Sequence, residues 1–157
     1  MGITEKITKN IDMTSWKDKI PVDYIYTAGI AGERFFREIK DNARIVGTKC
    51  EKCEVTYVPP KIYCERCFER LENYIDVGTK GTVHTFTICY ENVDGTKKEE
   101  PTIIAMVKID GTDGGLIHWL DEVHPKEVKI GMSVEAVFKA KEEREGSILD
   151  IKYFKPV

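Results

Sequence analysis

Four of the five cysteines stand in two Cys-x-x-Cys pairs, Cys50 with Cys53 and Cys64 with Cys67, with ten residues between the pairs. The short spacing within a pair aims both sulfurs at one point and lets nearby backbone N–H groups donate to them. Two such pairs supply the four thiolates of a tetrahedral metal site, and the spacing is that of a zinc ribbon. Because four cysteines complete the coordination shell, we expect a structural Zn2+ rather than a catalytic one. Iron bound as in rubredoxin stays an alternative, since a four-cysteine shell does not exclude it.

The residues between the two pairs, EVTYVPPKIY, predict a hairpin. Val55 and Tyr57 suit an extended strand, and the dipeptide Pro59-Pro60 forces a turn. Basic residues flank both pairs and reduce the negative charge of the thiolates: Lys49, Lys52, Arg66 and Arg70. We therefore expect the metal to stabilise the fold of a segment that is too short to form a hydrophobic core of its own.

The other reactive side chains do not form a catalytic group. Cys89 lies in an alternating strand pattern, where a free cysteine is usually a small core residue. The three histidines, His84, His118 and His124, lie at separate points of the chain. None has an acidic residue at a spacing typical of a catalytic pair. The sequence also lacks the motifs of serine hydrolases, zinc proteases, P-loops and dinucleotide-binding folds. We therefore expect no catalytic residue in this chain, and a protein that is not an enzyme on its own.

The elements around the cysteines change from helical to β-rich along the chain. Residues 31–41 predict a helix with Phe35, Phe36 and Ile39 on one face. Turn-rich segments separate five predicted strands, at residues 81–91, 102–110, 115–120, 133–141 and 147–154. The expected fold class is mainly β with N-terminal helices, in which a rubredoxin-like zinc ribbon precedes a five-stranded OB-fold barrel. A five-stranded open sheet or sandwich is the alternative.

The 157 residues are enough for one ordinary domain or two small ones. The expected parts are an N-terminal arm and helix at 1–44, the zinc ribbon at 45–75 and the barrel at 76–157. Apolar residues early in the chain have no obvious core of their own and predict a partner-binding arm, with an unstructured tail as the alternative: Trp16, Ile20, Val22, Tyr24, Ile25 and Tyr26.

Charge is distributed unevenly over a formal net charge of -3. Residues 34–70 hold nine Lys/Arg and six Asp/Glu, whereas residues 71–157 hold eleven and sixteen. OB-folds that bind single strands use a positive groove, so the acidic barrel argues against nucleic acid, which remains the alternative function. The sequence shows no secretory signal and no apolar run of membrane length, so we expect a cytoplasmic protein without a membrane partner.

The order of these motifs resembles the DUF35 family of zinc-ribbon/OB-fold proteins. The resemblance covers residues 30–157 and rests on Phe35-Phe36, the two cysteine pairs, Tyr57-x-Pro59-Pro60, Gly81-Thr82-Val83 with Phe86-Thr87, Gly131-Met132 with Val134, and Ile148-x-Asp150-Ile151 with Tyr153-Phe154. One position departs from the family pattern: Glu54 stands after the first pair, where the family often has glycine.

The resemblance implies a non-catalytic partner of condensing enzymes. Members of the family associate with thiolases and with hydroxymethylglutaryl-CoA synthases, and one setting is the thiolase of anaerobic toluene degradation. The implied assembly is a hetero-oligomer in which ribbon and arm dock on a thiolase-fold subunit and help to hold acyl-CoA. Candidate contacts to the CoA phosphates are Arg34, Arg37, Lys40, Arg44 and Lys61, with Phe35 or Phe36 for the adenine or the pantetheine arm. The alternative is a helix that packs its phenylalanines and leaves its charges in solvent.

Overall fold

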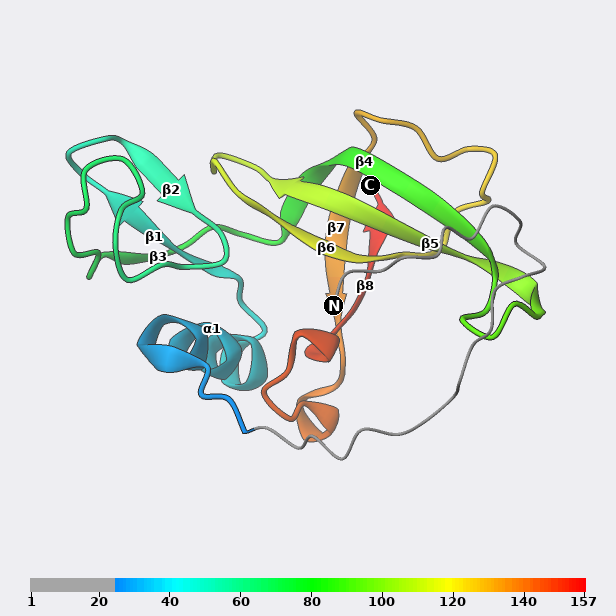
Figure 1. The fold of residues 1–157 in the computed structure, drawn as a ribbon, viewed down its shortest axis with the longest axis horizontal. Coiled ribbons are helices and arrows are strands. Elements are labelled where there is room, and N and C mark those ends of the chain that lie inside the picture. The colour runs from blue at the N-terminus through cyan, green and yellow to red at the C-terminus, as the bar shows by residue number, and fades with distance from the viewer. Residues whose placement is uncertain (1–24) are drawn as a thin grey trace, which may run out of the picture.

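The computed structural model describes residues 25–157, which form a helix, a small three-stranded sheet and a closed barrel (Figure 1). Helix α1 spans Gly29–Asn42. The small sheet contains β1 (Val46–Cys50), β2 (Val55–Tyr57) and β3 (Tyr74–Asp76), in the order β2-β1-β3. In Figure 1 this sheet and α1 lie together on the left, and the barrel lies to their right.

The barrel contains five strands: β4 (Lys80–Glu91), β5 (Lys97–Ile109), β6 (Gly115–Leu120), β7 (Ser133–Phe138) and β8 (Ile151–Pro156). They close in the order β4-β5-β6-β8-β7. The β6–β8 pair is parallel and the other neighbouring strands are antiparallel. This confirms the predicted OB-fold barrel after a zinc-ribbon region, and the open-sheet and sandwich alternatives are wrong.

The strand predicted at 147–154 is wrong in its first half, because Ile148–Asp150 form a 3-10 turn and β8 begins at Ile151. The carboxylate of Asp150 is buried and accepts bonds of 2.7–3.1 Å from three successive backbone N–H groups, those of Glu145, Gly146 and Ser147. Burial raises the pKa of Asp150, but these donors hold it below its ordinary value. Such local bonds compete with strand pairing. The strand predicted at 133–141 likewise ends early, at Phe138.

A β-bulge changes the alternation of β4. Its register with β5 shifts between Val83 and Thr85. As a result, Val83 and Phe86 both pack toward the core, although their separation in the chain would place them on opposite faces of a regular strand.

Helix α1 packs its apolar face against the barrel. Phe35 and Ile39 are buried in the same cluster that fills the barrel core, as the amphipathic pattern predicts. The helix ends where Ala43 takes left-handed backbone angles, with φ at 50°. The guanidinium of Arg144 donates to the carbonyl of Ile39 at 3.1 Å, as a second bond to an oxygen that also accepts the backbone N–H of Ala43 at 3.1 Å.

A histidine helps to close the barrel between β6 and β8, which share a single residue pair, Leu120 with Phe154. The buried ring of His118 places Nε2 at 3.1 Å from the carbonyl of Ile148, while Nδ1 accepts the backbone N–H of Trp119 at 2.8 Å. Nε2 therefore carries the proton that is donated to Ile148. Burial lowers the pKa of His118, which favours the neutral ring.

The ribbon docks on the turn between β5 and β6 through the backbone. The carboxylate of Asp113 accepts the N–H of Thr56 at 3.0 Å, and the Asp113 N–H donates to the Thr56 carbonyl at 2.9 Å. The N–H of Gly115 donates to the carbonyl of Val58 at 3.0 Å. A Cβ atom at Gly114 would lie 2.2 Å from that same carbonyl oxygen, so the approach requires glycine.

The predicted partner-binding arm lies mostly outside the described residues. Of its members, Trp16, Ile20, Val22 and Tyr24 precede the described chain, while Ile25 and Tyr26 are exposed. None of the helices in residues 25–157 combines the length and the apolar character that crossing a membrane requires.

We expect Gly114→Ala to lower the free energy of unfolding by about 2 kcal/mol, because the added methyl group overlaps the Val58 carbonyl. The matched control is Gly111→Ala in the same turn. Gly111 has φ at +69° and open space around it, so the control should lose about 1 kcal/mol from backbone strain alone. Urea unfolding of both variants measures the difference, and equal losses would contradict the proposed contact.

Candidate metal centre

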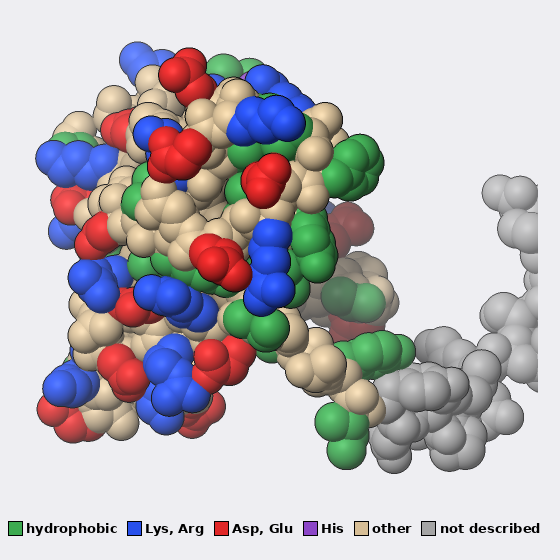
Figure 2. Space-filling model, turned by 90° about the vertical axis from the view of Figure 1, so that its left-hand side faces the viewer, with side chains coloured by type: hydrophobic (Ala, Val, Ile, Leu, Met, Phe, Trp, Pro, Cys, Tyr) green, Lys and Arg blue, Asp and Glu red, His purple; other side chains and the backbone are tan. Residues whose placement is uncertain are grey.

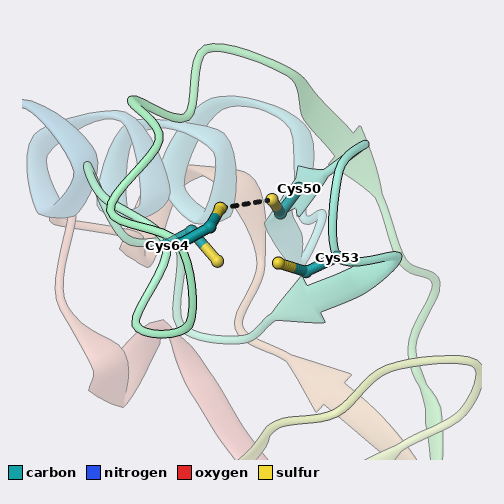
Figure 3. Close-up of side chains that lie close together, drawn as sticks. Cys50, Cys53 and Cys64 are labelled. Carbon is teal, nitrogen blue, oxygen red and sulfur yellow. Dashed lines mark hydrogen bonds between the residues drawn. The ribbon is translucent and has the colours of Figure 1, made fainter.

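The four paired cysteines converge on one point of the ribbon. The sulfurs of Cys50, Cys53, Cys64 and Cys67 all lie within 4.8 Å of one another. Figure 3 shows Cys50 and Cys53 approaching from one turn and Cys64 from another, with their sulfurs directed inward. Cys50 and Cys64 are buried, and the other two are partly buried.

The spacing of the sulfurs fits a tetrahedral zinc site. Zinc–sulfur bonds of about 2.3 Å place the sulfurs of a regular tetrahedron about 3.8 Å apart. The sulfurs of Cys50 and Cys67 are 3.6 Å apart, and all four cysteines are free thiols. The predicted four cysteines are therefore positioned to bind one metal ion, and together they fill its coordination shell. Among residues 25–157 they are the one cluster with such geometry.

Tyr57 supports the second cysteine pair, a role that the sequence analysis did not assign to it. Its hydroxyl accepts the backbone N–H of Glu65 at 3.1 Å and lies 3.3 Å from the sulfur of Cys64. The hydroxyl proton can therefore be donated to that sulfur, and the N–H of Arg66 also donates to it, at 3.4 Å. Such bonds orient a ligand and fix its charge. The one sequence clue was the position of Tyr57 in the predicted hairpin between the two pairs.

The four thiols differ in acidity. The bond from Tyr57 lowers the pKa of Cys64 to about 6, against the opposing effect of burial. The neighbouring Cys67 and burial raise the pKa of Cys53 to about 12, and burial also raises the pKa of Cys50. A metal ion bound by all four must displace protons from thiols that the protein otherwise keeps protonated, so metal affinity falls as the pH falls.

The ribbon has a small apolar core of its own. Its cluster of buried residues consists of Cys50, Val55, Tyr57, Cys64 and Leu71. Two of the five, Cys50 and Cys64, belong to the cysteine cluster, so a metal ion bound there would form part of this core. Hydrogen bonds of the buried Thr48 hydroxyl also stabilise the ribbon. This hydroxyl donates to the backbone carbonyl of Lys61 at 3.1 Å and accepts the backbone N–H of Lys61 at 2.9 Å.

Each cysteine pair is followed by a residue with left-handed backbone. Glu54 follows the first pair with φ at 55°, and Phe68 follows the second with φ at 59°. Glycine adopts this conformation at least cost, which explains why a glycine suits the position that Glu54 fills. The ring of Phe68 is 79% exposed, so little packing offsets the strain there.

The basic residues predicted to meet CoA phosphates lie on α1 and the ribbon, most of them beside an acid or an aromatic ring. Arg37 forms a salt bridge with Glu33, Lys61 with Glu65, and Arg44 with Glu38 at 2.6 Å. The guanidinium of Arg34 lies over the ring of Tyr74, 4.2 Å from its centroid. Lys40 is exposed. Figure 2 shows basic and acidic side chains interspersed over this side of the molecule. Phe35 is buried between α1 and the barrel, so Phe36 is the ring with partial access to solvent.

The remaining candidates lie apart from the cysteine cluster. Cys89 pairs with Thr102 on β5 and is partly buried. His84 and His124 are exposed, and His118 holds the barrel together. The structure brings none of these residues together as a catalytic group.

Comparison with known proteins identifies the same zinc ribbon and OB-fold barrel. Residues 37–72 match the ChsH2 rubredoxin-like zinc ribbon domain, and residues 74–139 match the ChsH2 C-terminal OB-fold domain. A DUF35 domain-containing scaffold protein of Methanocaldococcus jannaschii is 30% identical over 128 residues, which cover 79% of this chain and 89% of that protein. The chain belongs to the DUF35 family.

Two solved structures resemble this DUF35 chain. A DUF35-family protein of unknown function from Sulfolobus solfataricus matches with a TM-score of 0.65 and 30% identity, over 82% of this chain and 87% of that one. The Ltp2-ChsH2(DUF35) aldolase matches with a TM-score of 0.59 and 21% identity, over 78% of this chain and 91% of that one. At 21% identity, the second match shows similarity of fold alone.

Replacing the left-handed residues of this DUF35 chain by glycine should stabilise it. We expect Glu54→Gly and Phe68→Gly each to raise the free energy of unfolding by about 0.5–1 kcal/mol, since the strain of the left-handed backbone is relieved. Glu51→Gly in the same ribbon is the control and should be destabilising, because Glu51 is not among the residues with positive φ. Chemical denaturation of the zinc-loaded protein tests this, and a loss in the first two variants would refute it.

Removing the Tyr57 hydroxyl should weaken metal binding while the fold is retained. We expect Tyr57→Phe to lower zinc affinity about 10- to 100-fold, because Cys64 loses the hydrogen bond that favours its thiolate. The control is Tyr63→Phe, at a tyrosine that is exposed on the same ribbon. Competition with a chromophoric chelator measures both affinities, and an equal effect of the two variants would show that the hydroxyl does not act on the metal site.

Proposed function

We propose that this protein is a non-catalytic, zinc-binding accessory subunit of a thiolase-type enzyme that condenses or cleaves acyl-CoA. In this proposal the DUF35 chain helps to assemble the complex and to bind the CoA thioester, and the thiolase-fold partner carries out the reaction. The observation that carries the proposal is a cluster of four cysteines positioned to bind one metal ion, in a chain related to a scaffold protein. A shell closed in this way gives the bound zinc a structural role.

The names of the relatives support a hetero-oligomer. The Methanocaldococcus jannaschii relative is a scaffold protein by name. The second structural match is an aldolase whose name joins a DUF35 polypeptide, ChsH2, to another component, Ltp2. The class of the partner comes from the DUF35 resemblance, which implies association with thiolases. We propose such a thiolase-fold partner for this chain.

Within the proposed complex, α1 and the ribbon would contribute to the CoA site. The exposed ion pairs of Arg37 and Lys61 are weak, because solvent screens them, so each cation can exchange its carboxylate for a phosphate oxygen. Arg34 and Lys40 lie on the same helix, and Phe36 offers a partly exposed ring. Phe35 would act indirectly, by holding α1 on the barrel.

The test is purification of the full chain, with a C-terminal affinity tag, from the cells that produce it. We expect a thiolase-fold polypeptide to co-purify in a fixed ratio, identified by mass spectrometry, and one zinc per DUF35 chain in a colourless sample. The two purified proteins should then turn over acetyl-CoA or acetoacetyl-CoA together faster than the partner alone. A chain that purifies without such a partner, and binds single-stranded nucleic acid in a salt-sensitive way, would overturn the proposal.

A further inference from the structure

The outward face of the β5–β6 hairpin is apolar where an exposed sheet is normally polar. Ile104 and Met106 alternate with buried residues of β5, and Ile117 and Trp119 alternate with buried residues of β6. Ile104 stands opposite Trp119, and Met106 opposite Ile117. Ile117 is 71% exposed and Trp119 is 46% exposed, so these cross-strand pairs meet solvent.

The loop before β8 extends this surface. Ile148 and Leu149 join Ile104, Ile117 and Trp119 in lining a hollow of about 250 Å³. On the other side, Thr85 and Thr87 of β4 stand opposite Met106 and Ile104, so the surface continues without a charge. We define the apolar face as Ile104, Met106, Ile117, Trp119, Ile148 and Leu149.

An uncharged face of this extent is unusual in a chain with 32% charged residues, and such patches mark interaction sites. OB-folds bind their ligands on this part of the barrel, where the second and third strands meet the adjoining loops. Without lysine or arginine, the apolar face cannot neutralise phosphates, which argues against nucleic acid as its occupant. The hollow is also smaller than a typical small-molecule pocket and suits an inserted apolar side chain.

We propose that the apolar face is where the partner subunit docks, through an uncharged apolar surface of that folded subunit. The proposal rests on the function proposed above, which supplies the partner. It concerns a different part of the molecule from the basic residues of α1 and the ribbon. Docking of the partner therefore engages the barrel in addition to the ribbon and arm that the DUF35 resemblance implies, and the CoA contacts lie on α1 and the ribbon.

Charge complementarity distinguishes this occupant from the chain's own N-terminal segment. Residues 1–24 contain eight charged side chains, with no more than four uncharged residues in a row. Laying this segment over the apolar face would bury charges against it, which is unfavourable. A partner surface without charges carries no such cost.

The test measures the dissociation constant of the complex formed by the full-length chain and the co-purified thiolase-fold subunit. We expect Ile117→Lys and Leu149→Lys each to weaken binding about tenfold or more, because each places a charge within the buried interface. The matched control is Ile130→Lys, at a side chain that is 68% exposed in the turn before β7. The control should change the dissociation constant less than about twofold. Thermal unfolding checks that all variants fold, and Ile117→Thr provides a milder change.

Three results would overturn the proposal, and they can be told apart. Unchanged binding by Ile117→Lys and Leu149→Lys would place the interface elsewhere while leaving the accessory-subunit function intact. No complex with the wild-type chain would remove both proposals together. A wild-type chain that forms homodimers in sedimentation, with Ile117→Lys monomeric, would assign the apolar face to a second copy of this chain.

Discussion

Four sulfurs held within 4.8 Å of one another are the constraint on which the ribbon depends. Thiolates at this distance repel one another unless a cation joins them, and the apolar cluster around them is too small to hold them together alone. The consequence reaches beyond the ribbon, because β2 follows the first cysteine pair and supplies Thr56. That residue and Val58 form the backbone contacts to the β5–β6 turn. Metal binding thus positions the segment through which the ribbon meets the barrel.

Periodicity predicted the barrel well wherever the backbone follows a regular strand. The prediction for 115–120 agrees with β6 residue for residue. It failed at 147–154, because the carboxylate of Asp150 draws three backbone N–H groups into a tight turn. It also could not place the bulge in β4, where Val83 and Phe86 both face inward. Hydrogen bonds from a side chain to its local backbone leave the pattern of apolar residues unchanged, so periodicity does not detect them.

The cysteine cluster could be predicted from spacing alone, but its support could not. Tyr57 and Thr48 act through hydroxyl hydrogen bonds to Cys64 and Lys61, which lie seven and thirteen residues away in the chain. Gly114 matters because of a backbone carbonyl from a distant part of the chain. The DUF35 pattern marked Glu54 only as a departure from glycine, and the structure shows left-handed backbone both there and at Phe68. One signal of the apolar face was present in the sequence: the unbroken apolar run in β5 is typical of a strand covered on both faces.

The link between Arg144 and the carbonyl of Ile39 joins residues 105 positions apart, and it bears on how the chain acquires its fold during translation. Helix α1 is made before the barrel, yet its buried face packs on the barrel and its C-terminal end contacts a loop that is made much later. A contact of such long range forms only after the intervening chain has been ordered. The docking of α1 therefore waits until the barrel strands have been made, and until then Phe35 and Ile39 lack the core that buries them. While the barrel is being made, the growing chain exposes these apolar side chains, and such exposure favours aggregation.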